Sequence, residues 1–308
     1  MLKNFILLLF IVFIHVSMSH ALAAEEKEKK AEETKTPPAT SNAKKTTNTR
    51  PITPEPISIG KQHKADLKHY LSNETIIPIL AGPNDYLTII TPQTSVNTKG
   101  VAILLPDWQQ GVTSHHALNF LRTKLPHQGW TTIAIQPPMK PSNYPSLALT
   151  PEEQKKDNEK NLETYQLKLS ALIKEVMTKA KEYPGIVILI AQGQHGAMLT
   201  NLYQTQKNEA PNALILLSSY VNTNASFINS ANLNFANNIA LSDYPVLDLY
   251  LKYDHSLTIN KAQERKAQAK QEMNVYYRQR QINNYHAGTY PEQSLLTEIN
   301  SWLKAIGW

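Results

Sequence analysis

Short apolar segments recur along the chain after residue 70, and longer segments with helical periodicity lie between them. This alternation predicts a mostly parallel β-sheet that is covered by helices on both faces. The turn Ala-Gly-Pro-Asn-Asp at residues 81–85 is of the hairpin type, so we expect the sheet to begin with an antiparallel pair. The predicted strands are residues 75–80, 86–91, 100–105, 130–136, 186–191, 213–217, 245–251 and 275–282.

Apolar residues at helical spacing identify the covering helices. Ser114 can cap a helix that Gly129 ends, and a long helix from about residue 151 to 182 turns one apolar stripe toward the sheet. A strongly charged helix is expected at residues 259–273, and Pro291 opens the terminal helix.

The number and order of these elements match an α/β-hydrolase core, with a mostly parallel sheet of about eight strands and helices on both faces. Residues 222–243 are rich in asparagine and have weak periodicity. Their position and length predict a reduced cap or lid loop above the carboxyl ends of the strands.

The N-terminus has the pattern of a secretory signal. Lys3 precedes an apolar run over residues 5–16, and the small-residue site Ala21-Leu22-Ala23 follows. We therefore expect residues 1–24 to be a signal peptide and the mature protein to be periplasmic or secreted. The apolar run is short for a bilayer span, so an uncleaved N-terminal anchor is the alternative.

Composition separates a tether from a folded domain and limits the partners. Residues 25–56 have almost no large apolar side chain and predict a disordered tether, whereas residues 57–308 have the length of one domain. The absence of cysteine excludes disulfides. The net charge of +6 comes without a dense basic block interleaved with aromatics, so we expect no nucleic acid partner. The best basic patch, expected to be a solvated helix face, comprises Lys261, Arg265, Lys266 and Lys270, extended by Arg278 and Arg280.

The turn after the strand that starts at Ile186 is where an α/β-hydrolase carries its nucleophile, within a small-x-nucleophile-x-small pattern. Here the turn reads Gln192-Gly193-Gln194-His195, and its centre can be placed on Gly193, Gln194 or His195. None of these registers supplies a serine, cysteine or aspartate. Ser218 and Ser219 are nearby hydroxyls, but we expect them to lack the strained, exposed turn that presents a nucleophile.

Other polar residues follow the strands whose carboxyl ends meet at the same edge of the sheet. Asp254 and His286 stand in the acid and base positions of an α/β-hydrolase, where the carboxylate orients the imidazole. Asp107 and Trp108 occupy the loop that would supply an oxyanion-hole amide. A carboxylate there would repel a developing oxyanion, which weakens the enzyme interpretation.

Metal and cofactor motifs are absent from the sequence. It contains ten histidines but no His-x-His or His-Glu-x-x-His spacing, and it has no glycine-rich phosphate loop. We therefore expect neither a metal nor a cofactor.

Residues 121–137, Leu-Arg-Thr-Lys-Leu-Pro-His-Gln-Gly-Trp-Thr-Thr-Ile-Ala-Ile-Gln-Pro, resemble the signature of a family of exported bacterial α/β-hydrolase-like proteins without an assigned function. Shorter matches are Pro245-Val246-Leu247-Asp248-Leu249-Tyr250, Tyr277-Arg278-Gln279 and Trp302-Leu303. The resemblance covers the chain from about residue 65 onward. It implies the fold, an exported location and a nucleophile turn that often lacks serine, but it implies no substrate.

These patterns support one leading hypothesis and two alternatives. The leading hypothesis is a periplasmic hydrolase-like protein without serine-hydrolase activity that binds a small ligand or an envelope protein above the strand ends. The first alternative is an unconventional hydrolase that uses Asp254 and His286 as a general-base pair on an ester or related acyl substrate. The second is a structural envelope protein that an uncleaved N-terminus holds at the membrane.

Overall fold

The computed structural model describes residues 56–71, 75–114 and 117–308, and these belong to a compact unit over Glu55–Trp308. The predicted signal peptide and almost all of the predicted tether lie outside the described residues. Within the described ranges, no helix is both long and apolar enough to cross a membrane.

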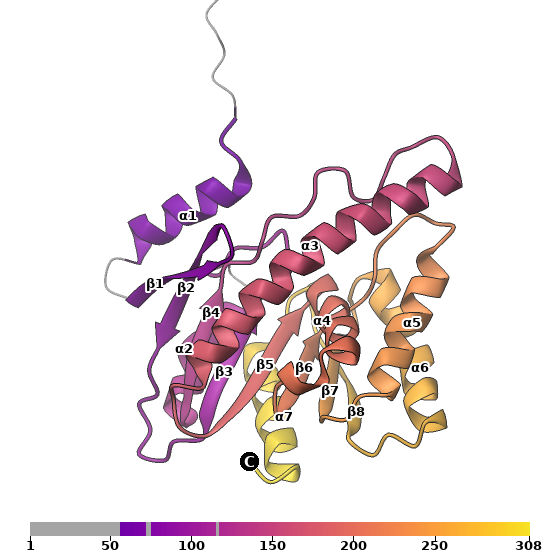
Figure 1. Ribbon diagram of the computed structural model, residues 1–308. Coiled ribbons are helices and arrows are strands. Elements are labelled where there is room, and N and C mark those ends of the chain that lie inside the picture. The colour runs from indigo at the N-terminus through magenta and orange to yellow at the C-terminus, as the bar shows by residue number, and fades with distance from the viewer. Residues whose placement is uncertain (1–55, 72–74, 115–116) are drawn as a thin grey trace, which may run out of the picture. The chain divides into compact units, whose positions relative to one another are not determined.

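The core of the unit is an eight-stranded sheet in the order β1-β2-β4-β3-β5-β6-β7-β8 (Figure 1). The β1–β2 and β2–β4 pairs are antiparallel, and every later pair is parallel. The sequence prediction of a mostly parallel sheet with an antiparallel start is therefore confirmed. The strands are β1 (Thr75–Ala81), β2 (Asn84–Thr91), β3 (Gly100–Leu105), β4 (Trp130–Ile135), β5 (Ile186–Gln192), β6 (Ala213–Leu217), β7 (Val246–Leu251) and β8 (Tyr277–Ile282).

Two apolar cores form on the two faces of this sheet. In β3, Val101, Ile103 and Leu105 enter one core, while Ala102 and Leu104 enter the other. Every residue of this strand is buried, which explains why its sequence is a continuous apolar run rather than an alternating one.

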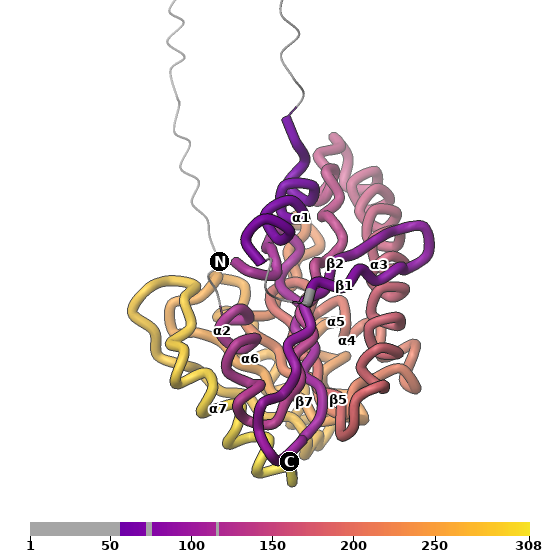
Figure 2. Tube along the Cα trace, turned by 90° about the vertical axis from the view of Figure 1, so that its left-hand side faces the viewer, coloured from indigo at the N-terminus to yellow at the C-terminus, as the bar shows by residue number. Residues whose placement is uncertain are grey.

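Helices cover both faces. Helices α3, α4 and α5 contribute to one core, and α2 and α7 contribute to the other; Figure 2 shows them on opposite sides of the sheet. Helix α6 packs beside α5. The helices are α1 (Ile59–Tyr70), α2 (Ala117–Lys124), α3 (Pro151–Ala180), α4 (Gln194–Thr205), α5 (Ile228–Ala240), α6 (Ser256–Gln271) and α7 (Glu292–Ala305), with short 3₁₀ turns at Leu125–Gln128 and Lys207–Glu209.

Two helices, α5 and α1, differ from the sequence prediction. Residues 222–243 are not a lid loop, because they contain α5, whose Asn232, Phe235 and Ile239 are buried at helical spacing. The apolar stripe was not recognised in the sequence because Asn232 occupies a buried position in it. The Asn232 side chain forms hydrogen bonds with both the N–H and the carbonyl of Val221. Helix α1 was not predicted at all, since Leu67 is its only buried residue.

A buried polar cluster connects β7, β8 and α6. Arg265 Nε donates to Asp248 Oδ2 at 2.7 Å, and neither side chain is exposed to solvent. The hydroxyl of Tyr277 and the amide of Gln279 donate to the same oxygen, at 2.7 and 3.0 Å. Arg265 is therefore not part of a solvated basic face, and the short motifs around Asp248 and Tyr277 have a structural role.

Candidate functional site

Four loops converge at the carboxyl ends of the central parallel strands. Asp107 follows β3, Gly193 follows β5, Ser218 follows β6 and Asp254 comes shortly after β7. The backbone N–H of Gly193 bonds Leu217 and the N–H of Ser218 bonds Leu249, so the strand ladder extends to the edge of the site. This is the edge at which open α/β sheets gather their functional groups.

The turn between β5 and α4 has its centre at Gly193. This residue has φ 61° and ψ −134° and precedes the first turn of α4. Such backbone angles are strained for a residue with a side chain and relaxed for glycine. Among the three registers that the sequence left open, the structure therefore selects the one in which glycine stands at the nucleophile position.

The carboxyl group of Asp107 lies where the missing nucleophile side chain would lie. A Cβ atom added to Gly193 would come within 2.4 Å of Asp107 Oδ2. Asp107 Oδ1 accepts hydrogen bonds from the N–H of Trp108 at 2.9 Å and of Gln194 at 3.3 Å. The residue after the nucleophile and the loop after β3 supply the two oxyanion-hole amides in α/β-hydrolases. Here both amides bind the protein's own carboxylate.

Packing holds this carboxylate in place. Burial raises the pKa of Asp107 to about 6, although the N–H groups of Trp108 and Gln194 and the charge of Lys140 act in the opposite direction. The indole of Trp108 is buried edge-on against Tyr144 and Tyr165, with centroid distances of 5.4 Å in both cases. Aromatic contacts thus hold the loop after β3 in place, and no small residues leave space there for a substrate oxygen.

His195 belongs to the core beneath the turn. Its Nδ1 lies 2.5 Å from the carbonyl of Pro106, and its Nε2 lies 2.6 Å from the Tyr165 hydroxyl. Burial lowers the pKa of His195 to about 4, and the Pro106 carbonyl only partly offsets this effect. A neutral imidazole with both nitrogens engaged orients the loop after β3, and it does not face a substrate.

Asp254 and His286 do not form the pair that the sequence suggests. Asp254 Oδ2 accepts from the Ser218 hydroxyl at 2.6 Å and from the Leu251 N–H at 2.9 Å, and Oδ1 accepts from the His255 N–H at 2.7 Å. His286 is exposed, and in the described part of the chain no hydrogen bond or ion pair joins its imidazole to Asp254. Ser218 takes the contact that an imidazole would make.

The backbone conformation of Ser218 differs from what the sequence predicted. The φ of this residue is 49°, so the residue has the strained backbone that the sequence did not predict. However, it is only 9% exposed, and its hydroxyl lies between Asp254 and the Tyr290 hydroxyl, which is 2.7 Å away. Ser219 is fully buried against Gly196. Neither hydroxyl is presented to a substrate.

Tyr220 and His255 were missed by the sequence reasoning. Their rings stack with centroids 4.1 Å apart. Burial raises the pKa of Tyr220 to about 12, and the carboxylates of Asp107 and Asp254 add to this shift. The position of Tyr220 just after Ser218-Ser219, at the end of a buried strand, was the signal that could have identified it.

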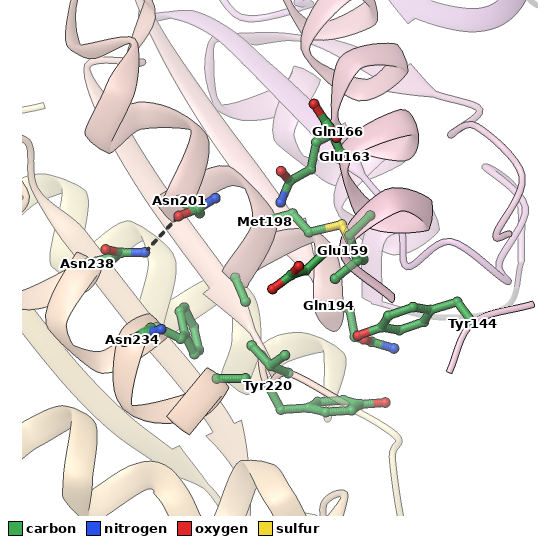
Figure 3. Close-up of a pocket in the computed structure, with 15 residues that line it drawn as sticks. Tyr144, Glu159, Glu163, Gln166, Gln194, Met198, Asn201, Tyr220, Asn234 and Asn238 are labelled. Atoms are coloured by element: carbon green, nitrogen blue, oxygen red, sulfur yellow. Dashed lines mark hydrogen bonds between the residues drawn. The ribbon is translucent and has the colours of Figure 1, made fainter. Parts of the chain in front are cut away.

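A cleft of about 500 Å³ opens beside the turn, between α3, α4 and α5 (Figure 3). Gln194 and Tyr220 connect it to the strand ends. Its polar lining comes largely from the charged half of α3, where the sequence predicted no site residue, and from asparagines of α5, which belong to the segment that the sequence predicted as a lid over the ligand site. In the described ranges, no three His, Cys, Asp or Glu side chains are grouped as metal ligands would be.

The steric clash that a side chain at position 193 would make with Asp107 can be measured. We expect Gly193→Ala to destabilise the protein by more than the roughly 1–3 kcal/mol of backbone strain, because the new methyl group meets the carboxylate. Gly82→Ala is a matched control, because Gly82 has φ 59° and open space around its Cβ position. Denaturant unfolding should show that Asp107→Ala reduces the cost of Gly193→Ala by about 1 kcal/mol or more. Equal costs at the two glycines would contradict this arrangement.

Solved structures share this architecture. Esterase 2 of Thermogutta terrifontis aligns with a TM-score of 0.55 at 11% identity, over 76% of this chain and 95% of its own. A dienelactone hydrolase from Anabaena variabilis aligns with 0.53 at 12%, over 76% and 97%. An α/β serine hydrolase homologue from Coxiella burnetii aligns with 0.51 at 11%, over 77% and 100%. At these identities the likeness establishes the α/β-hydrolase-like fold alone.

No curated protein matches the sequence. A family match, in contrast, extends over residues 4–305 and so includes every element that builds the site. The chain belongs to the family described as protein of unknown function (DUF3530), and it has an α/β-hydrolase-like fold.

Proposed function

We propose that this protein is an exported, hydrolase-like binding protein without serine-hydrolase activity, and that the cleft beside Gly193 holds a small ligand. The observation that carries the proposal is the contact of Asp107 with the amides of Trp108 and Gln194. An acyl transfer needs a nucleophile and free oxyanion donors at this point. Glycine supplies no nucleophile, and the donors already have an acceptor.

Ligand binding is supported by the cleft itself. Its volume of about 500 Å³ is in the range of small-molecule sites, and it combines apolar side chains with several polar ones. General-base chemistry by Asp254 and His286 is not favoured, because the half-buried Asp254 is hydrogen-bonded to Ser218 and, among the described residues, makes no hydrogen bond to the imidazole.

A fluorophosphonate probe tests the absence of an acyl-enzyme nucleophile. We expect the native protein to be labelled no more strongly than the heat-denatured protein. Thermogutta terrifontis esterase 2, whose solved structure is phosphoramylated by tabun, serves as the positive control. Heat-sensitive labelling of this protein would overturn the proposal, and so would ester hydrolysis that disappears in the His286→Ala variant.

Export is the second part of the proposal, and it rests on Lys3, the apolar run after it and the Ala21-Leu22-Ala23 site. Osmotic shock of cells that express the full chain should release a protein whose intact mass shows loss of the first 20 or so residues. Recovery of the uncleaved chain in the membrane fraction would contradict export in soluble form.

A further inference from the structure

Among the described residues, the polar side chains that line the cleft are mostly uncharged amides and include no lysine or arginine. They include two carboxylates, both from α3. Anionic ligands are therefore disfavoured, since they would face two like charges without a cationic partner. The lining amides and carboxylates are Gln166, Gln194, Asn201, Asn234, Asn238, Glu159 and Glu163.

Gln194 offers a hydrogen-bond donor to a ligand oxygen. The residue is only 6% exposed, and its Oε1 accepts from the N–H of Asn222 at 3.3 Å. Figure 3 shows its amide beside Tyr144 at one end of the cleft, and its Nε2 is not among the buried polar atoms that lack a partner. The nitrogen is therefore open to the cleft, where a hydroxyl or carbonyl oxygen of a ligand can accept its hydrogen bond.

The α3 side of the cleft requires donors. Glu159 and Glu163 lie one turn apart on α3, and an ionised carboxylate only accepts hydrogen bonds. Figure 3 shows the Glu159 carboxylate directed into the middle of the cleft. A ligand that contacts these carboxylates and Gln194 must both donate and accept hydrogen bonds, which a hydroxyl group can do.

Part of the cleft lining is apolar. It consists of side chains from α3, α4, α5 and the segment after β6, and it offers van der Waals contact to C–H groups. A ring that carries several hydroxyl groups presents hydrogen-bonding groups to the polar lining and C–H groups to the apolar lining. The apolar lining residues are Leu162, Ala197, Met198, Val221, Ala231 and Phe235.

We propose that the cleft binds a saccharide of one or two rings that is neutral or carries an amine, and that it rejects acidic saccharides. The inference rests on the proposed function in so far as the cleft is the ligand site. A linear polyamine fits less well, because it would satisfy Glu159 and Glu163 but offer no acceptor to Gln194. An amino group on a sugar adds charge complementarity to the hydroxyl contacts.

Calorimetric titration of the full chain with three matched disaccharides tests the proposal. The probes are β-1,4-linked glucosamine disaccharide, its N-acetylated form, and a disaccharide of the same linkage that carries a uronic acid. We expect the first two to bind and the third to bind about tenfold more weakly or not at all. Glu163→Gln should weaken the amino disaccharide about fivefold relative to the N-acetylated one.

Two further variants separate binding from folding. Gln194→Met keeps the side-chain volume and should weaken both favoured disaccharides about tenfold, because it removes the donor. Glu175→Gln changes an exposed charge of α3 outside the cleft lining and should leave all affinities unchanged. Thermal unfolding confirms that each variant is folded.

Three results would overturn the saccharide assignment: no disaccharide binds at millimolar concentration, spermidine binds while the disaccharides do not, or the acidic disaccharide binds best. None of these results produces a covalent adduct. Heat-sensitive fluorophosphonate labelling, in contrast, would contradict the proposed function whichever saccharide binds, so the two failures are distinguishable.

Discussion

Asp248→Ala is expected to destabilise the protein by about 3–5 kcal/mol, because it leaves the fully buried Arg265 without its counter-charge. The hydroxyl of Tyr277 loses its carboxylate acceptor at the same time, and the amide of Gln279 loses one of its acceptors. Urea unfolding followed by tryptophan fluorescence measures the change. Asp248 does not line the cleft, but Arg265 lies 5.7 Å over the ring of Phe235, which does, so ligand affinity is measured separately at a temperature where the variant is folded.

The matched control removes both charges. Asp248→Leu combined with Arg265→Met should recover most of the lost stability, because an apolar pair of similar volume needs no desolvated charge. If the double variant is as unstable as Asp248→Ala, the cost comes from the hydrogen bonds of Tyr277 and Gln279 rather than from the unpaired guanidinium.

Asp107 and His195 are expected to have opposite effects on the pH dependence of stability. Burial raises the pKa of Asp107 from 3.8 to about 6, so the folded state binds its proton more tightly than the unfolded state. Its contribution to stability is greatest below pH 4 and is lost as the pH rises to 6. Burial lowers the pKa of His195 from 6.5 to about 4, so its contribution is full above pH 6.5 and is lost as the pH falls to 4.

The contributions of Asp107 and His195 to the pH dependence of stability nearly cancel in the native protein. Each amounts to about 3 kcal/mol over its window, since one pKa unit corresponds to about 1.4 kcal/mol. Asp107→Asn keeps an oxygen acceptor for the N–H groups of Trp108 and Gln194 and removes the carboxyl titration. The stability of this variant relative to the native chain should therefore rise by about 2 kcal/mol between pH 4 and pH 6.

Denaturant unfolding at several pH values tests this expectation, with Asp85→Asn as an exposed control on β2. A difference between Asp107→Asn and the native protein that stays constant from pH 4 to pH 6 would show that Asp107 is ionised throughout this range in the folded state.

The sheet was predictable because its strands carry their signal locally. Residues 100–105 and 213–217 are continuous apolar runs, and the structure assigns strands with the same bounds. Helix α5 was not predictable in the same way, because Asn232 stands among Phe235 and Ile239 in its buried stripe. The hydrogen bonds of Asn232 with the backbone of Val221 and Ile228 explain why an amide is buried there.

The candidate site was predictable in its position and not in its contacts. Strand ends identified Asp107, Gly193 and Asp254 as neighbours at one edge of the sheet. Sequence order alone suggested that Asp254 would orient His286, yet Ser218 and Tyr290 occupy the space beside the carboxylate. Hydrogen bonds of this kind depend on loop geometry within a few tenths of an ångström, which no periodicity records.

The contact between Gly193 and Asp107 also bears on the evolutionary history of the family. A serine at position 193 would place its Cβ against the Asp107 carboxylate, and a change at Asp107 alone would still leave no hydroxyl at this turn. Positions 107 and 193 are therefore coupled, and we expect a side chain at 193 to be accepted only together with a smaller residue at 107.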